Sequence, residues 1–178
     1  MKNSIYIFLI TLVFISCKKD DEVPQPIDDL PPATQVGAVM LACKVNGVPY
    51  ICKGYEQVTA YYQWVNGGYG FVVTGRKETD SLMKISVGNM ENAPIEEGKT
   101  YILNGDIPGY FGGAGLLNGF NNFESVVTNN NYTGEMTITK FDLENEIVSG
   151  TFWFDIENPW TGEKIEVREG RFDTHFSQ

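Results

Sequence analysis

The chain has 178 residues, with 13 Lys and Arg against 23 Asp and Glu, and its formal net charge is −10. A surface this acidic repels the phosphates of nucleic acids, so the composition argues against DNA or RNA as a partner. The sequence holds one histidine, which excludes most histidine-based catalytic triads and metal clusters, and its length suits one folded domain.

The chain begins MKNSIYIFLITLVFISC, which is typical of a secretory signal. One lysine precedes an apolar run over 5–15 that is too short to span a bilayer comfortably. The segment Phe14-Ile15-Ser16-Cys17 resembles a bacterial lipobox with Phe in place of the usual Leu. This resemblance implies that residues 1–16 are removed and that Cys17 becomes an acylated, membrane-anchored N-terminus. The alternatives are a plain cleaved signal and a short membrane anchor.

Residues 17–36 are expected to hold the acylated cysteine and a flexible tether. The stretch KKDDEVPQPIDDLPP is rich in charge and proline, so it buries too little apolar surface to offset the entropy of ordering. Its opening KKDDE resembles the surface-export signal of lipoproteins from the Bacteroidota. The resemblance implies an outer-membrane lipoprotein exposed on the cell surface. The alternatives are a linker without sorting meaning and a protein that faces the periplasm.

We expect the folded domain over residues 37–178, beginning with a β-hairpin around Asn46-Gly47. This dipeptide favours a two-residue type I′ turn, because both of its residues tolerate a positive φ. The resulting register pairs Val45 with Val48, Cys43 with Tyr50 and Leu41 with Cys52, and all six side chains point to one face that can be buried.

Cys43 and Cys52 are the two cysteines that remain once Cys17 is acylated. In the predicted register they are diagonal neighbours about 7–8 Å apart, whereas a disulfide needs Cα atoms roughly 4.4–6.8 Å apart. We therefore favour two buried thiols over a disulfide, which requires a slipped register or a bulge. A catalytic cysteine is the least favoured alternative, because the only histidine, His175, lies far away near the chain end.

Further strands are predicted wherever apolar and polar residues alternate, at 58–64, 71–76, 82–87, 98–103 and 123–127. In the third of these runs, Met83, Ile85 and Val87 are expected to face the core. The last quarter of the chain, residues 132–176, predicts three or four strands joined by turns at 142–145 and 158–162.

Within that last quarter, Phe152, Phe154 and Ile156 fall on one side of a strand and Trp153 on the other. Roughly 9–11 short strands with regular turns predict a single all-β domain, an antiparallel β-sandwich or flattened barrel.

Residues 104–122 contain six glycines and little sign of regular structure. As a binding loop, this segment would present Tyr110, Phe111 and Phe120 to a ligand or partner. Alternatively, it packs its aromatic side chains onto the sandwich or forms a loose edge strand. Trp153 is a fourth ligand-binding candidate, because exposed aromatic side chains on a sheet stack on sugars or anchor proteins. The alternative is that a loop covers that face.

No complete dinucleotide loop, phosphate loop or zinc motif occurs in the sequence, so we expect no cofactor and no metal. Asp142, Glu144 and Glu146 alternate around one turn and are weak calcium candidates through their oxygen atoms. The alternative is that these acids are only solvated. The sequence nominates no catalytic residue.

Several segments together carry a family resemblance: VGA followed by LACKVNG, then GKTYIL, TITKFD through VSGTFWF, EGRFD and the preceding PPATQ. They resemble a family of small Bacteroidota surface lipoproteins whose domain has no known function. The resemblance covers nearly the whole mature chain, although the glycine-rich segment and Cys52 depart from the family pattern. It implies an envelope location and an all-β domain, and it supplies no activity.

These observations favour a lipid-anchored cell-envelope protein that is not an enzyme. We expect a binding or accessory module whose partner is a glycan, a peptide or an envelope protein. The alternative is a carboxylate-dependent hydrolase that acts on an envelope or extracellular polymer.

Overall fold

The computed structural model describes residues 29–65, 67–79, 81–89, 94–106, 109–119 and 122–178. The predicted signal, Cys17, most of the predicted tether and Phe120 lie outside these residues. Within the part of the chain that is described, no helix is long and apolar enough to cross a membrane.

The described residues form eleven strands of one sheet, in the order β2-β1-β11-β10-β9-β6-β7-β5-β4-β3 with β8 paired to β7. Their bounds are β1 Met40–Val45, β2 Val48–Lys53, β3 Val58–Val65, β4 Gly68–Arg76, β5 Leu82–Asn89, β6 Thr100–Leu103, β7 Tyr110–Asn118, β8 Asn122–Val127, β9 Gly134–Asp142, β10 Ile147–Glu157 and β11 Lys164–His175.

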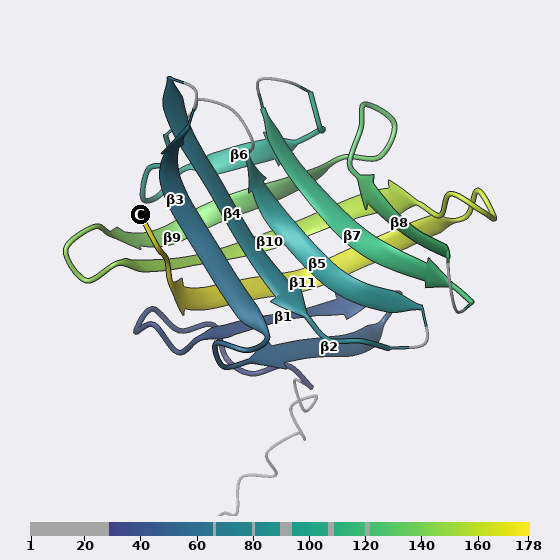
Figure 1. Cartoon of the computed structure of the whole chain (residues 1–178), viewed down its shortest axis with the longest axis horizontal. Coiled ribbons are helices and arrows are strands. Elements are labelled where there is room, and N and C mark those ends of the chain that lie inside the picture. The colour runs from purple at the N-terminus through teal and green to yellow at the C-terminus, as the bar shows by residue number, and fades with distance from the viewer. Residues whose placement is uncertain (1–28, 66, 80, 90–93, 107–108, 120–121) are drawn as a thin grey trace, which may run out of the picture.

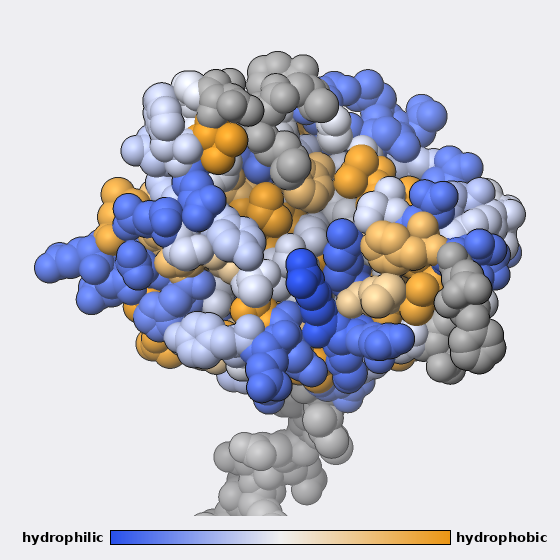
Figure 2. All heavy atoms as spheres, in the orientation of Figure 1, coloured by the Kyte–Doolittle hydropathy of each residue, from blue (hydrophilic) through white to orange (hydrophobic). Residues whose placement is uncertain are grey.

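The sheet folds over on itself into two layers (Figure 1). One layer contains β3, β4, β5, β7 and β8, and it crosses steeply in front of β1, β11, β10, β9 and β6. Neighbouring strands are antiparallel except for a short parallel contact between β6 and β7. The prediction of an all-β sandwich or flattened barrel is confirmed. The outer face of the front layer carries hydrophilic side chains interrupted by hydrophobic ones (Figure 2).

Phe154 occupies the centre of the core between the two layers and is fully buried. A Cβ atom at Gly112 on β7 would lie 2.4 Å from the Phe154 ring, and one at Gly134 on β9 would lie 2.4 Å from the Phe154 Cβ atom. Interior atoms pack at crystal-like density. The ring therefore fits only because Gly112 lacks a side chain, and Gly134 lets β9 lie close to the backbone of β10 at Phe154.

The prediction of an irregular segment at 104–122 is wrong over 110–118, which form β7. This strand lies between β5 and β8 and is neither a loop nor a loose edge. Its glycines are needed by both faces: Gly112 leaves room for Phe154, and a Cβ at Gly115 would lie 2.8 Å from the Phe123 ring. Glycine marks close packing here, and local composition alone cannot distinguish that from flexibility.

The hairpin register is confirmed, with Val45 opposite Val48, Cys43 opposite Tyr50 and Leu41 opposite Cys52. Asn46 and Gly47 adopt φ values of 48° and 80°, as a type I′ turn requires. The expectation that all six side chains are buried is wrong for Val48, which is 67% exposed. It begins β2, the last strand at this edge of the sheet, and lies beside the turn.

The C-terminal strands β9, β10 and β11 are confirmed as a meander, with Phe152, Phe154 and Ile156 buried. A bulge interrupts the pairing of β10 with β11 between Phe152 and Phe154.

A second bulge lies between Leu82 and Lys84 on β5. It reverses the expected alternation at the start of that strand, because one extra residue shifts the following side chains to the other face. Leu82 is buried, whereas Met83, expected in the core, is only partly buried.

Residues 30–38, which we call the N-terminal strap, lie along β11. Asp173 of β11 is fully buried, and its carboxylate accepts hydrogen bonds from the Thr34 hydroxyl at 2.6 Å and from the backbone N–H groups of 36, 37 and 38 at 2.8–3.1 Å. The Ser149 hydroxyl donates a fifth bond at 2.8 Å. Leu30 is also buried, so the folded unit begins earlier than residue 37.

Burial by itself raises the pKa of the Asp173 carboxyl, but the hydrogen bonds from Thr34 and the strap N–H groups outweigh it. The pKa of Asp173 is therefore lowered. A carboxylate that accepts several N–H bonds is stabilised in its charged form. The strap is thus held by a buried negative charge.

Candidate ligand-binding groove

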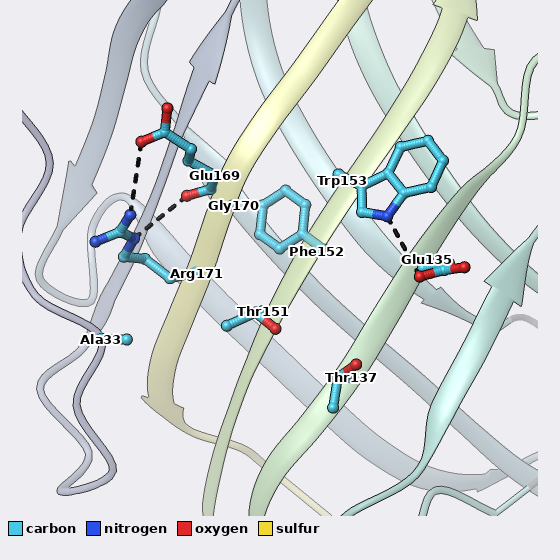
Figure 3. A pocket seen from close by; sticks show the side chains of 9 residues that line it. All are labelled: Ala33, Glu135, Thr137, Thr151, Phe152, Trp153, Glu169, Gly170 and Arg171. Carbon is cyan, nitrogen blue, oxygen red and sulfur yellow. Dashed lines mark hydrogen bonds and ion pairs between the residues drawn. The ribbon is translucent and has the colours of Figure 1, made fainter.

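A groove of about 490 Å³ lies on the outer face of the back layer. It crosses β9, β10 and β11 and is bordered by the strap (Figure 3). Its lining residues are Ala33, Glu135, Thr137, Thr151, Phe152, Trp153, Glu169, Gly170 and Arg171. Trp153 was a sequence candidate, and the other groove residues were not.

Cross-strand pairing arranges the groove in two rows of side chains. Thr137 of β9 pairs with Thr151 of β10, which in turn pairs with Arg171 of β11. In the adjacent row, Ile102 of β6 pairs with Glu135, and Glu135 pairs with Trp153. One row thus offers hydroxyl groups and a guanidinium, and the other offers a carboxylate beside an indole.

The Trp153 indole is 37% exposed and is fixed from two sides. Its Nε1–H donates to Glu135 Oε2 at 3.4 Å, and the Arg168 guanidinium carbon lies 5.4 Å from the ring centroid. A cation that lies above the face of an aromatic ring is attracted to the ring electrostatically. The ring is therefore presented to the groove in a fixed orientation.

The bulge in β11 shapes the edge of the groove opposite Trp153. Glu169 has a φ of 54°, and the burial pattern places both Arg168 and Glu169 outward between buried Val167 and Gly170. Two consecutive outward residues are the mark of a β-bulge, a feature that is common beside functional sites. Lys44 forms an ion pair with Glu169 at 3.0 Å.

Arg171 connects the groove to the strap. Its Nε–H donates to the Glu169 carbonyl at 3.2 Å and its Nη1–H to the Pro31 carbonyl at 3.0 Å (Figure 3 shows the first bond). Ala33 of the strap lines the same groove. The strap therefore forms part of the groove wall through Ala33. It is also bonded to a second lining residue, Arg171, through the Pro31 carbonyl.

The four sequence candidates for ligand binding do not form one site. Tyr110 begins β7, where its ring packs 4.1 Å from that of Tyr101 and its hydroxyl donates to the Pro94 carbonyl at 3.4 Å. Burial, and then the nearby Tyr101 hydroxyl, raise the pKa of Tyr110 to about 12. Phe111 follows it on the opposite face of β7, in the layer that does not carry Trp153, and Phe120 is outside the described residues.

Cys43 and Cys52 are both buried and are free thiols in the structure. Burial raises the pKa of each, and the proximity of Cys52 raises that of Cys43 further. A thiol with a raised pKa is a poor nucleophile. His175 is placed elsewhere: its Nδ1 contacts the Asn145 carbonyl at 3.3 Å.

The three calcium candidates, Asp142, Glu144 and Glu146, do not point their carboxylates at a common position; one is bonded within its turn and two face solvent. The Asp142 carboxylate accepts hydrogen bonds from the Asn145 side chain at 2.9 Å and from the Asn145 backbone at 3.0 Å, and these bonds lower the pKa of Asp142. Glu144 and Glu146 are exposed. Over the described ranges, no three His, Cys, Asp or Glu side chains are grouped to hold a metal ion.

Comparison of the chain with protein-family models, with curated proteins and with solved structures found no significant match. The resemblance to Bacteroidota lipoproteins therefore stays a prediction, and the functional argument depends on the groove itself.

Proposed function

We propose that this protein is a lipid-anchored, non-catalytic module of the cell envelope that binds a neutral glycan in the Trp153 groove. The observation that carries the proposal is the oriented, partly exposed indole of Trp153 beside hydroxyl, carboxylate and guanidinium groups. Ligand sites typically combine an apolar surface with a few fixed polar groups.

The chemistry of the groove suits a sugar ring. The apolar face of a pyranose would lie on the Trp153 indole, and its hydroxyls would meet Glu135, Thr137 and Thr151. Glu135 and Glu169 both line the groove. Arg171 is turned toward Glu169 and the strap, with its Nη2 atom 4.0 Å from Glu169 Oε2. An acidic sugar would be repelled by these carboxylates, so we assign a neutral one.

The test is a screen of neutral and acidic glycans with the purified full chain, followed by titration of the best ligand. Trp153→Ala should weaken binding at least tenfold, since aromatic side chains that a ligand covers on binding contribute most of the affinity at such contacts. Trp64→Ala is the matched control, because Trp64 is 65% exposed on β3 in the other layer. Equal affinities of the two variants, or the absence of any neutral ligand, would sink the proposal.

The alternative, a carboxylate-dependent hydrolase, is favoured by one observation: two carboxylates from different strands, Glu135 and Glu169, share the groove. Glycoside hydrolysis uses such a pair. A hydrolase would release products from the bound glycan, and Glu135→Gln would stop that release while keeping affinity. If the wild-type chain cleaved the bound glycan, the function of this groove would be catalysis and not binding alone.

A further inference from the structure

A second groove, of about 410 Å³, lies on the outer face of the front layer. It is lined by Arg76, Lys77, Glu78, Met83, Lys84 and Phe123, and we call it the cationic groove. Figure 2 shows hydrophilic side chains gathered near the end of β4 beside hydrophobic ones over β7 and β8. Among the described residues that line it, three are basic and one is acidic, in a protein whose net charge is −10.

Arg76 of β4 and Lys84 of β5 are directly opposite each other in the sheet. Like charges in directly paired positions destabilise a sheet. The described residues offer no carboxylate partner to either side chain, whereas Lys44, Lys99, Lys140, Lys164, Arg168 and Arg171 all form ion pairs with acids. Within the described part of the chain, this pair of cations therefore adds repulsion between β4 and β5 that no ion pair offsets.

The bulge at Met83 is a second and independent feature of the same place. It puts both Met83 and Lys84 on the groove side of β5. A Cβ at Gly115 would lie 2.8 Å from both the Lys84 side chain and the Phe123 ring. The missing side chain at Gly115 therefore lets Lys84 cross the Phe123 ring, with its Nζ atom 5.6 Å from the ring centroid.

The groove thus combines positive charge with an aromatic surface, since Phe123 is 48% exposed. We propose that the cationic groove binds an acidic polysaccharide that carries uronic acid residues. The carboxylates would meet Arg76, Lys77 and Lys84, and a guanidinium pairs with a carboxylate in bidentate fashion. The apolar face of a sugar ring would lie against Phe123. This site is separate from the Trp153 groove and does not depend on it.

The experiment is titration of the full chain with polygalacturonate, with neutral dextran, polyglutamate and inorganic phosphate as comparison ligands. The double variant Arg76→Gln/Lys84→Gln should bind polygalacturonate at least tenfold more weakly. Lys99→Gln/Lys140→Gln removes the same charge from the back layer and should change affinity less than twofold. Trp153→Ala should keep polygalacturonate binding, which separates this site from the proposed neutral-glycan site.

A purely structural role for these cations predicts a lower melting temperature, whereas relief of the like-charge pair predicts an unchanged or higher one. Should the double variant fold poorly, Arg76→Gln/Lys77→Gln changes only exposed side chains and leaves the Lys84–Phe123 contact in place. Equal weakening by the front and back double variants would overturn the proposal. So would affinity for polyglutamate or phosphate that matches that for polygalacturonate, and so would no binding of polygalacturonate by the wild type.

Discussion

Replacing Asp173 by Asn preserves the shape of the side chain but removes one of the two acceptor oxygens that hold the strap. In the structure, Oδ2 accepts from Thr34 and the N–H groups of 36 and 38, and Oδ1 accepts from the N–H of 37 and from Ser149. Whichever way the new amide is turned, its NH₂ group faces at least one backbone N–H. In the variant, the amide NH₂ of residue 173 and a backbone N–H of the strap are therefore two hydrogen-bond donors that face each other in a buried site without an acceptor between them.

A hydrogen bond to a charged group contributes about 1.5–3 kcal/mol, and a buried unsatisfied donor costs about 1–3 kcal/mol. We expect Asp173→Asn to lower the free energy of unfolding by about 3 kcal/mol, a large share of the 5–15 kcal/mol typical of a domain. Urea denaturation followed by tryptophan fluorescence measures this loss. Asp142→Asn is the control, since that carboxylate also accepts two bonds but at an exposed turn. Equal losses in the two variants would refute the role of Asp173.

The same carboxylate predicts a pH dependence. The pKa of Asp173 is lowered in the folded state, so the unfolded chain takes up the proton first as the pH falls. Its contribution to stability is complete above the unfolded pKa of about 3.9 and is lost as the pH falls from there through the folded pKa. Asp173→Asn has no such contribution. The stability gap between the wild type and the variant should therefore narrow below about pH 4.

Three further predictions concern other parts of the fold. Gly112→Ala should destabilise the protein by about 1–3 kcal/mol, because the new methyl group meets the Phe154 ring; Gly70→Ala, whose Cβ would have only a backbone oxygen at 3.9 Å, is the control in the same urea assay. Cys43 and Cys52 should resist iodoacetamide at pH 8 in the folded protein and react in urea, and rapid labelling of the folded chain would contradict their burial. Tyr110→Phe should remove a tyrosine that ionises near pH 12 in an ultraviolet titration, and an unchanged titration curve would contradict the raised pKa.

The strands and the first hairpin were predictable because their signals are local. Asn46-Gly47 fixes the turn and thereby the register, and side-chain alternation in β10 separates Phe152 and Phe154 from Trp153. The fold class follows from many such segments. Strand β7 was missed because its glycines are required by Phe154 and Phe123, which lie on other strands.

The groove was only partly predictable for the same reason. Alternation indicates that Trp153 points outward, but its neighbours Glu135 and Arg171 depend on the pairing of three strands. The bulge that turns both Arg168 and Glu169 outward leaves no clear mark in the sequence. The strap has the composition of a tether, and the carboxylate that orders it is 135–139 residues away along the chain.

The strap also has a mechanical consequence. Where the protein is held by its N-terminus, a pulling force enters the domain through residues 30–38 and loads the bonds to Asp173 before it reaches any strand pairing. Ala33 and the Arg171–Pro31 bond transmit that force to the wall of the Trp153 groove. Tension at the N-terminal end of the strap would thus reach the groove wall as well as the sheet behind it.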